Sequence, residues 1–407
     1  MYLRGSKWSM LKKRRKRSSP WRIFILLLLI AGAIYLNQIV VPATPPLFIP
    51  TATATQDPEI FANQAASFFN EGKLTQSIES YEQAVSADPG NPSNYVNLAR
   101  VQILTGRYEE ALENAELGLL RNPDNPLAHA MRAWALDFLG SYLEAEAAIK
   151  RAIELDENNG IAHAIYSEIL VDTGNYEAAA EESRLAVELD PTSLEVRRAR
   201  GYVLYWTSNY ELAANEYQAA LSINDKIPNL HLMLGYIHSA KGEYDLAVES
   251  FNQANALNPT DPVPDYEASR VYFAIGEFAR AVQYAEQALR DDPTDPNLNG
   301  NLGVMYSKNN ERNEAIKYLS LAIQGGVTDD GEIVEGIPLS YDLQTIEFYS
   351  SYGLALARED RCSEAIPIFQ AMLTIVPNDE IAVFNAETGL EICQENLKDP
   401  VEGSEGN

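Results

Sequence analysis

Four histidines and two cysteines are the side chains in this sequence best suited to metal binding or nucleophilic chemistry. His129 and His163 lie 34 residues apart, which is the period of an internal repeat described below. They therefore occupy equivalent positions in two neighbouring repeats and could approach one another. Two imidazoles without a third ligand are weak evidence for zinc, so we interpret them as packing residues. The acidic residues around Asp330 lack the alternating spacing that a calcium loop requires.

Other patterns of catalytic residues are absent from the sequence. It contains no glycine-rich phosphate loop, no nucleophile elbow and no carboxylate pair that differs from an ordinary acidic helix face. We therefore predict no catalytic residues, no cofactor, no metal and a protein that is not an enzyme.

Charge is divided unevenly along the chain. The first 22 residues contain nine basic residues and no acid, so all 58 acidic residues and only 22 of the 31 basic ones lie beyond them. An acidic surface repels phosphate backbones and favours neutral or basic partners. We expect a protein or peptide partner and no nucleic acid.

The N-terminal region divides into three segments. Residues 1–22 are a basic segment, residues 23–41 are apolar enough for a transmembrane helix, and residues 42–57 form a linker rich in proline and threonine. The positive-inside rule predicts a single-pass cell membrane protein with a cytoplasmic N terminus and extracytoplasmic repeats. Two alternatives remain, a cleaved signal peptide and a nuclear localisation signal in Lys12–Arg17.

An internal repeat of 34 residues runs from residue 58 onward. Glycine recurs in one register from Gly72 to Gly276, with Ser208 and Asn310 replacing it in two copies. Aromatic residues follow two positions later, small residues recur at fixed places, and proline closes most copies. Glycine can end a first helix in the left-handed conformation, alanine permits close helix crossing, and proline stops a second helix.

This pattern resembles the tetratricopeptide repeat (TPR), and the sixth copy shows it most fully. Its signature residues are Leu234, Gly235, Gly242, Tyr244, Ala247, Phe251, Ala254 and Pro259. The resemblance implies an all-α fold, a right-handed superhelical α-solenoid of about nine helix hairpins with a C-terminal capping helix. It also implies that the first helix of each hairpin lines a concave ligand surface.

Departures from the repeat suggest the remaining boundaries. Ser77 replaces the small alanine in the first copy, as we would expect of an end repeat that faces solvent. We predict repeats 1–8 at 58–329, an inserted loop at 330–345, a ninth repeat at 346–379, a polar capping helix at 380–396 and an acidic tail at 397–407.

The two cysteines fall near the predicted C-terminal end of the array. Cys362 begins the second helix of the ninth copy, and Cys393 ends the helix expected to pack antiparallel to it. The pair could form a disulfide outside the cytoplasm, or both residues could remain packed thiols.

Aromatic residues and arginine gather at the predicted concave positions, and such residues dominate interface energetics. Each ring could instead belong to the core between helices. The predicted peptide-binding groove consists of Trp134, Phe138, Arg198, Tyr202, Tyr205, Trp206, Tyr236, Tyr266, Arg270 and Phe273.

These observations predict a membrane-tethered scaffold for protein–protein interaction, which binds a peptide or a partner helix in its groove. The alternative is an accessory or assembly subunit of an envelope enzyme or secretion complex. Repeat arrays serve unrelated functions, so the family predicts the mode of action better than the partner.

Overall fold

The computed structural model describes residues 19–40 and 58–398. Its contacts divide the chain into two units, Met1–Asp57 and Pro58–Asn407. The predicted basic segment up to residue 18, the linker and the tail beyond residue 398 lie outside the described residues.

The described part of the N-terminal unit is one apolar helix. α1 runs from Pro20 to Tyr35 and continues as a π-helical turn, η1, from Leu36 to Val40. None of the α1 side chains is buried. The 19 residues Pro20–Gln38 are long and apolar enough to cross a membrane, and a signal sequence would pass the same test.

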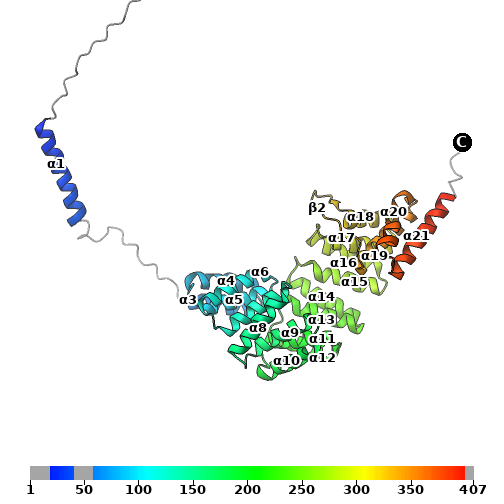
Figure 1. Cartoon of the computed structure of the whole chain (residues 1–407), viewed down its shortest axis with the longest axis horizontal. Coiled ribbons are helices and arrows are strands. Elements are labelled where there is room, and N and C mark those ends of the chain that lie inside the picture. The colour runs from blue at the N-terminus through cyan, green and yellow to red at the C-terminus, as the bar shows by residue number, and fades with distance from the viewer. Residues whose placement is uncertain (1–18, 41–57, 399–407) are drawn as a thin grey trace, which may run out of the picture. The chain divides into compact units, whose positions relative to one another are not determined.

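The second unit is built from helix pairs that follow one another in chain order (Figure 1). The first helix of each pair is called the A helix here and the second the B helix. The A helices are α3 (Pro58–Asn70), α5 (Pro92–Leu104), α7 (Pro126–Phe138), α9 (Gly160–Asp172), α11 (Leu194–Trp206), α13 (Pro228–Lys241), α15 (Pro262–Ala274), α17 (Pro296–Lys308) and α19 (Leu343–Arg358). The B helices are α4 (Leu74–Ala87), α6 (Tyr108–Arg121), α8 (Tyr142–Leu155), α10 (Tyr176–Leu189), α12 (Tyr210–Ile223), α14 (Tyr244–Leu257), α16 (Phe278–Asp291), α18 (Arg312–Gln324) and α20 (Cys362–Ile375).

A final helix, α21 (Glu380–Lys398), packs against α19 and α20. The predicted all-α array of helix hairpins with one additional C-terminal helix is therefore confirmed. The ninth pair begins at Leu343, slightly before the expected boundary at 346.

Local sequence explains where most A helices begin and end. The side chains of Asn91, Asn125 and Asn159 each accept a hydrogen bond from a backbone N–H in the first turn of the following helix. After the A helix the chain turns through a left-handed residue, which is glycine in most pairs. Ser208 and Asn310 adopt that conformation too, with φ of 61° and 67°, so they occupy the glycine position without changing the turn.

Small residues allow the two helices of a pair to pack closely. The recurring alanines, such as Ala247 and Ala254 in the sixth pair, are completely buried. A Cβ atom on Gly235 would lie 2.3 Å from the ring of Phe251, so only glycine fits there.

The prediction that Ser77 marks a solvent-facing end repeat is wrong. Ser77 is completely buried, and its hydroxyl donates a hydrogen bond of 2.8 Å to the carbonyl oxygen of Ala65. The hydrogen bond satisfies the polar atom that replaces the alanine methyl group, so the first pair packs as tightly as its neighbours.

The inserted segment contains a short hairpin between α18 and α19. β1 (Gly326–Val327) pairs antiparallel with β2 (Ile333–Val334). Val334 and Leu339 are buried, and the Ile337 amide donates a 2.8 Å hydrogen bond to the Ala322 carbonyl. The insertion is thus packed on the end of α18 rather than extending freely into solvent.

The capping helix α21 differs from the predicted polar cap. Ala382 and Ala386 are buried against the ninth pair, whereas Ile381 and Phe384 are strongly exposed. The outer face of this helix is therefore partly apolar, and the expectation of a polar outer surface is wrong at these two positions.

Candidate functional site

The predicted groove residues all lie on A helices, but their exposure differs widely. Trp206 and Phe138 are half-exposed, at 51% and 42%. Trp134 and Arg198 are buried, at 1% and 6%. The remaining six, Tyr202, Tyr205, Tyr236, Tyr266, Arg270 and Phe273, are partly exposed.

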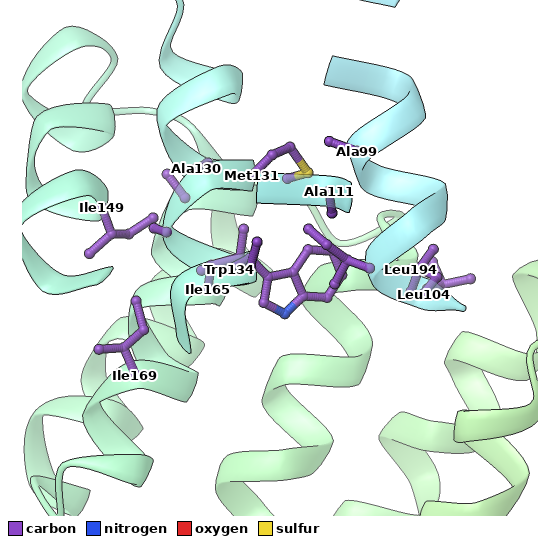
Figure 2. Close-up of a cluster of buried hydrophobic side chains, with 14 of the residues drawn as sticks. Ala99, Leu104, Ala111, Ala130, Met131, Trp134, Ile149, Ile165, Ile169 and Leu194 are labelled. Carbon is purple, nitrogen blue, oxygen red and sulfur yellow. The ribbon is translucent and has the colours of Figure 1, made fainter. Parts of the chain in front are cut away.

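Trp134 lies in the core between α5, α7, α9 and α11 (Figure 2). Met131, Ile165 and Leu194 belong to the same buried cluster. The indole N–H of Trp134 donates a hydrogen bond of 3.1 Å to Glu168 Oε2. A buried tryptophan requires such a partner for its polar atom.

Glu168 joins Trp134 to Arg198 and so forms a buried polar cluster. The Arg198 guanidinium forms an ion pair with Glu168 and lies over the Trp134 ring, 4.7 Å from its centroid. Burial raises the pKa of Glu168 to about 7, although the Arg198 charge lowers it. Arg198 Nε and Glu168 Oε1 have no hydrogen-bond partner among the described residues.

Two further carboxyl groups lie beside this cluster. Burial, together with the neighbouring carboxylates of Asp172 and Glu168, raises the pKa of Asp137 to about 8. Burial also raises the pKa of Asp172, whose Oδ1 accepts a 2.6 Å hydrogen bond from the Tyr202 hydroxyl. This region therefore holds three carboxyl groups and a single guanidinium, which favours protonation of the acids.

An aromatic stretch continues from Tyr202 onto the following repeats. Trp206 makes edge contacts with Tyr202 and Tyr205, at centroid distances of 6.2 Å and 5.8 Å. In the next pair Tyr236 packs against Phe251, and its hydroxyl donates a hydrogen bond of 3.2 Å to Glu267.

The seventh repeat is linked to the ninth across the concave side. Arg270 forms an ion pair of 3.0 Å with Glu347 and lies 5.2 Å from the centroid of the Phe273 ring. The amide of Gln344 donates a long hydrogen bond of 3.4 Å to the Tyr266 hydroxyl. These contacts occupy part of the predicted groove with side chains from the chain itself.

Contacts between successive A helices are most extensive between α9 and α11, moderate from α5 to α9 and between α17 and α19, and few between α15 and α17. They are sparser between α11 and α13 and between α13 and α15. The A helices of the fifth to seventh repeats are therefore loosely packed against one another, and Trp206 and Tyr236 lie on them.

Repeats far apart in the sequence also meet on this side of the array. Arg100 pairs with buried Glu195 at 2.5 Å, and the Asn224 amide donates a 2.8 Å hydrogen bond to the Phe69 carbonyl. A cavity of about 400 Å³ lies between the first three repeats and the sixth and seventh. Its lining includes Leu104, Tyr108, Phe138, Arg198, Leu232 and Asp261.

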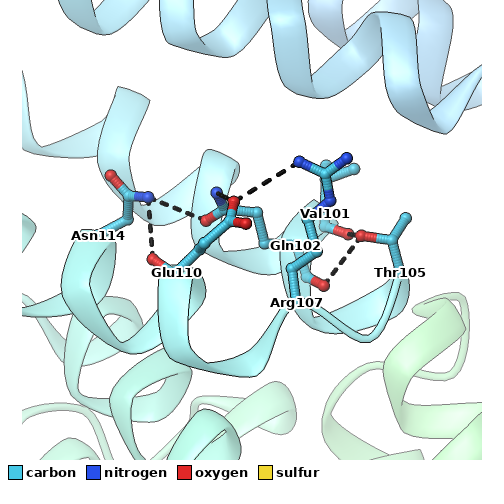
Figure 3. A network of polar contacts seen from close by, with 6 residues as sticks. All are labelled: Val101, Gln102, Thr105, Arg107, Glu110 and Asn114. Atoms are coloured by element: carbon cyan, nitrogen blue, oxygen red, sulfur yellow. Dashed lines mark hydrogen bonds and ion pairs between the residues drawn. The ribbon is translucent and has the colours of Figure 1, made fainter. Parts of the chain in front are cut away.

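A polar network fixes the turn of the second pair at the edge of this cavity (Figure 3). Gln102 is buried, donates to Glu110 at 3.1 Å and accepts from Asn114 at 2.9 Å. The Thr105 hydroxyl bonds to the carbonyl groups of Val101 and Gln102. Because these bonds satisfy a buried amide, they hold the α5–α6 turn rigidly in place.

The histidines form hydrogen bonds within their own repeat or with the end of the preceding one. His129 Nε2 lies 2.9 Å from the Pro123 carbonyl oxygen, and His163 Nδ1 lies 2.6 Å from Glu182 Oε2. The hydrogen bond to Glu182 raises the pKa of His163, and burial opposes it. Among the described residues, no group of three or more His, Cys, Asp or Glu side chains could hold a metal ion.

The structure joins Cys362 at the start of α20 to Cys393 in α21, with their Cα atoms 5.4 Å apart. Both residues are buried. The bond would fasten the capping helix to the ninth pair.

Sequence reasoning overlooked Asp137, Glu168 and Asp172. The 34-residue register contains the signal that could have found them, because Asp172 is equivalent to Phe138 and Trp206. Glu168 is equivalent in the same way to Trp134 and Tyr202. Asp137 is equivalent to Tyr205, which lies 68 residues later. The groove prediction considered only aromatic residues and arginine, so it left out all three acidic residues.

Models of the tetratricopeptide repeat match most of the array. One matches residues 68–135 and 272–329, a second matches residues 130–193, and a third matches residues 228–261. Together they cover more than half of the chain. No curated protein matches the chain significantly.

Solved structures with similar folds include the APC/C hetero-tetramer Cut9-Hcn1, at 17% identity and a TM-score of 0.48 over 69% of this chain and 52% of that one. The chain thus spans about half the length of that protein. Pseudomonas aeruginosa pilF matches at 21% identity and a TM-score of 0.42, over 48% of this chain and 88% of that one. PilW, a widely conserved type IV pilus biogenesis factor, matches at 19% identity and a TM-score of 0.44, over 48% of this chain and 90% of that one.

The matched ranges contain helix pairs with left-handed turn residues and buried alanines. Proteins with this repeat act characteristically as scaffolds for protein–protein interaction. The chain belongs to the tetratricopeptide-repeat family.

Proposed function

We propose that this chain is a membrane-tethered, non-catalytic scaffold that binds an extended segment or a helix of a partner protein against the A helices of its fifth to seventh repeats. The observation that carries the proposal is the half-exposed Trp206 beside partly exposed Tyr202, Tyr205 and Tyr236, where contacts between A helices are sparse. Exposed aromatic rings on a preformed surface supply contact area with little ordering cost.

The membrane part of the proposal concerns α1. Its length and composition suit one membrane span, and the nine basic residues in the first 22 positions favour a cytoplasmic N terminus. We expect the repeats on the opposite side. If α1 were instead a cleaved signal sequence, the mature protein would begin after it, and N-terminal sequencing of the native protein would distinguish the two.

Trp206→Ala tests the binding surface. Because Trp206 is half-exposed and ends its helix, the variant should remain folded and lose about 2 kcal/mol of binding free energy for the native partner. The matched control is Tyr176→Ala, which removes a ring that is 44% exposed at the start of a B helix. Equal affinity for the partner in both variants would contradict the proposed surface.

The second candidate function is an accessory subunit of an envelope enzyme or secretion complex. The inserted segment favours it, because Val327, Ile333 and Tyr341 are strongly exposed apolar or aromatic side chains outside the repeat pattern. Ile333→Ser should leave the fold intact, since the side chain is exposed. The accessory function would be favoured if a co-purifying enzyme were lost from the Ile333→Ser variant but retained by the Trp206→Ala variant.

A further inference from the structure

Three neighbouring A helices end on the concave side of the third to fifth repeats. α7 ends at Phe138, α9 at Asp172 and α11 at Trp206. α9 contacts both α7 and α11, so the three ends are adjacent. The aligned peptide dipoles of a helix place partial negative charge at its C terminus. The exposed carboxylate is that of Asp172, and the half-exposed rings of Phe138 and Trp206 lie on the two neighbouring helix ends. Asp172 therefore lies in a region that already attracts positive charge.

A second observation concerns the side chains beneath these ends. Asp137 is only 4% exposed, its carboxyl interacts with that of Asp172, and its Oδ1 has no hydrogen-bond partner among the described residues. Glu168 is 3% exposed and likewise has one oxygen without a partner. Buried polar atoms without partners are uncommon, and they indicate that a group is missing.

The charge balance indicates which kind of group would fit. Several titratable and charged side chains of the described residues face this region. They are Arg107 and Tyr108 at the α5–α6 turn, Asp137 from α7, Glu168 and Asp172 from α9, Glu195, Arg198 and Tyr202 from α11, and Tyr217 from α12. Both arginines are already paired, Arg198 with Glu168 and Arg107 with Glu110. A positively charged ligand would offset the remaining acidic charge.

We propose that this helix-end cluster, defined as Phe138, Asp172 and Trp206 with Asp137 beneath them, binds a lysine or arginine side chain of the partner protein. The inference rests on the proposed function, because it identifies the chemistry of the segment that the scaffold binds. The carboxylate of Asp172 supplies a charge-assisted hydrogen bond, and the two rings supply cation–π contact. The strongly acidic body of the chain steers a basic segment toward the same surface.

The cluster should bind more tightly as pH rises. Burial raises the pKa of Asp137 to about 8 and that of Glu168 to about 7. Both groups lose protons between about pH 6 and pH 9, so the cluster becomes more negative while a lysine, with a pKa near 10.4, stays charged. Affinity for a basic side chain therefore increases over this range.

The test uses the full chain in lipid nanodiscs and an array of surface-bound ten-residue peptides in which every position is varied. We expect the wild type to prefer lysine or arginine over glutamine at one position by about tenfold. Asp172→Asn should remove this preference while retaining binding to the same peptides, and Asp172→Glu should restore it. Glu249→Gln, which neutralises an exposed carboxylate on α14, is the control and should change nothing.

The possible outcomes separate the two proposals. Peptide binding without a basic preference, or with a preference that survives Asp172→Asn, would overturn the inference and leave the scaffold function standing. A complete absence of peptide binding by the folded wild type would contradict both. Circular dichroism of each variant shows whether its helices are retained.

Discussion

The third and fourth repeats use the same positions of the A helix in the opposite way to the fifth to seventh repeats. Trp134 is buried beneath Arg198 and bonded to Glu168, whereas the equivalent Tyr202 and Tyr236 are partly exposed. Packing between A helices explains the contrast, since it is extensive from α7 to α11 and sparse on either side of α13. Position within a repeat therefore defines the face of a residue, and the spacing of neighbouring helices decides whether that face is core or surface.

The largest effect should come from breaking the buried ion pair. Glu168→Ala leaves Arg198 buried without its partner, and arginine cannot lose its charge, so the variant should lose about 3–5 kcal/mol of stability. Hydrogen exchange should accelerate in α7, α9 and α11 and remain unchanged in α17 and α19.

Arg198→Met is the informative companion to this variant. Glu168 can become protonated when its partner is removed, because burial already raises its pKa to about 7. Arg198→Met should therefore destabilise less than Glu168→Ala below about pH 7. Equal effects would contradict this account of the cluster.

An intermediate effect is expected at the C-terminal end. Replacing Cys362 and Cys393 together by serine should destabilise α21 by about 2–4 kcal/mol, because the bond closes a loop with a sequence separation of 31. Hydrogen exchange in α21 would measure the loss, with α7 to α11 as the internal control.

The same cysteine pair tests the proposed topology. In native membranes the two thiols should resist alkylation until a reductant is added, since disulfides persist mainly outside the cytoplasm. Rapid alkylation of both residues in the folded, unreduced protein would contradict an extracytoplasmic location for the repeats.

The smallest expected effect concerns pH. The folded state holds a proton on Asp137 up to about pH 8, whereas the unfolded chain releases it near pH 4, so the stability of this region falls as pH rises between these values. Asp137→Asn should weaken that dependence by on the order of 2 kcal/mol between pH 6 and pH 9. Identical pH profiles for hydrogen exchange of α7 in the wild type and the Asp137→Asn variant would contradict a raised pKa for Asp137.

The repeat register predicted the helix pairs because glycine, alanine and proline have local effects that do not depend on distant residues. Ser208 and Asn310 adopt the left-handed conformation although neither is glycine, so the position in the repeat predicts the turn even where the residue differs. It could not predict the burial of Trp134 or the Arg100–Glu195 ion pair, because both depend on how closely the A helices approach one another. Ser77 was misread because its hydrogen bond to Ala65 is visible only in three dimensions.

Photocrosslinking tests the central claim of a protein-binding surface most directly. A photoreactive residue replacing Trp206 in the full chain, activated in native membranes, should capture one dominant protein that the same residue at position 176 does not capture. The captured site should lie in a segment that contains lysine or arginine. Diffuse products, or crosslinks only to other copies of this chain, would contradict the account.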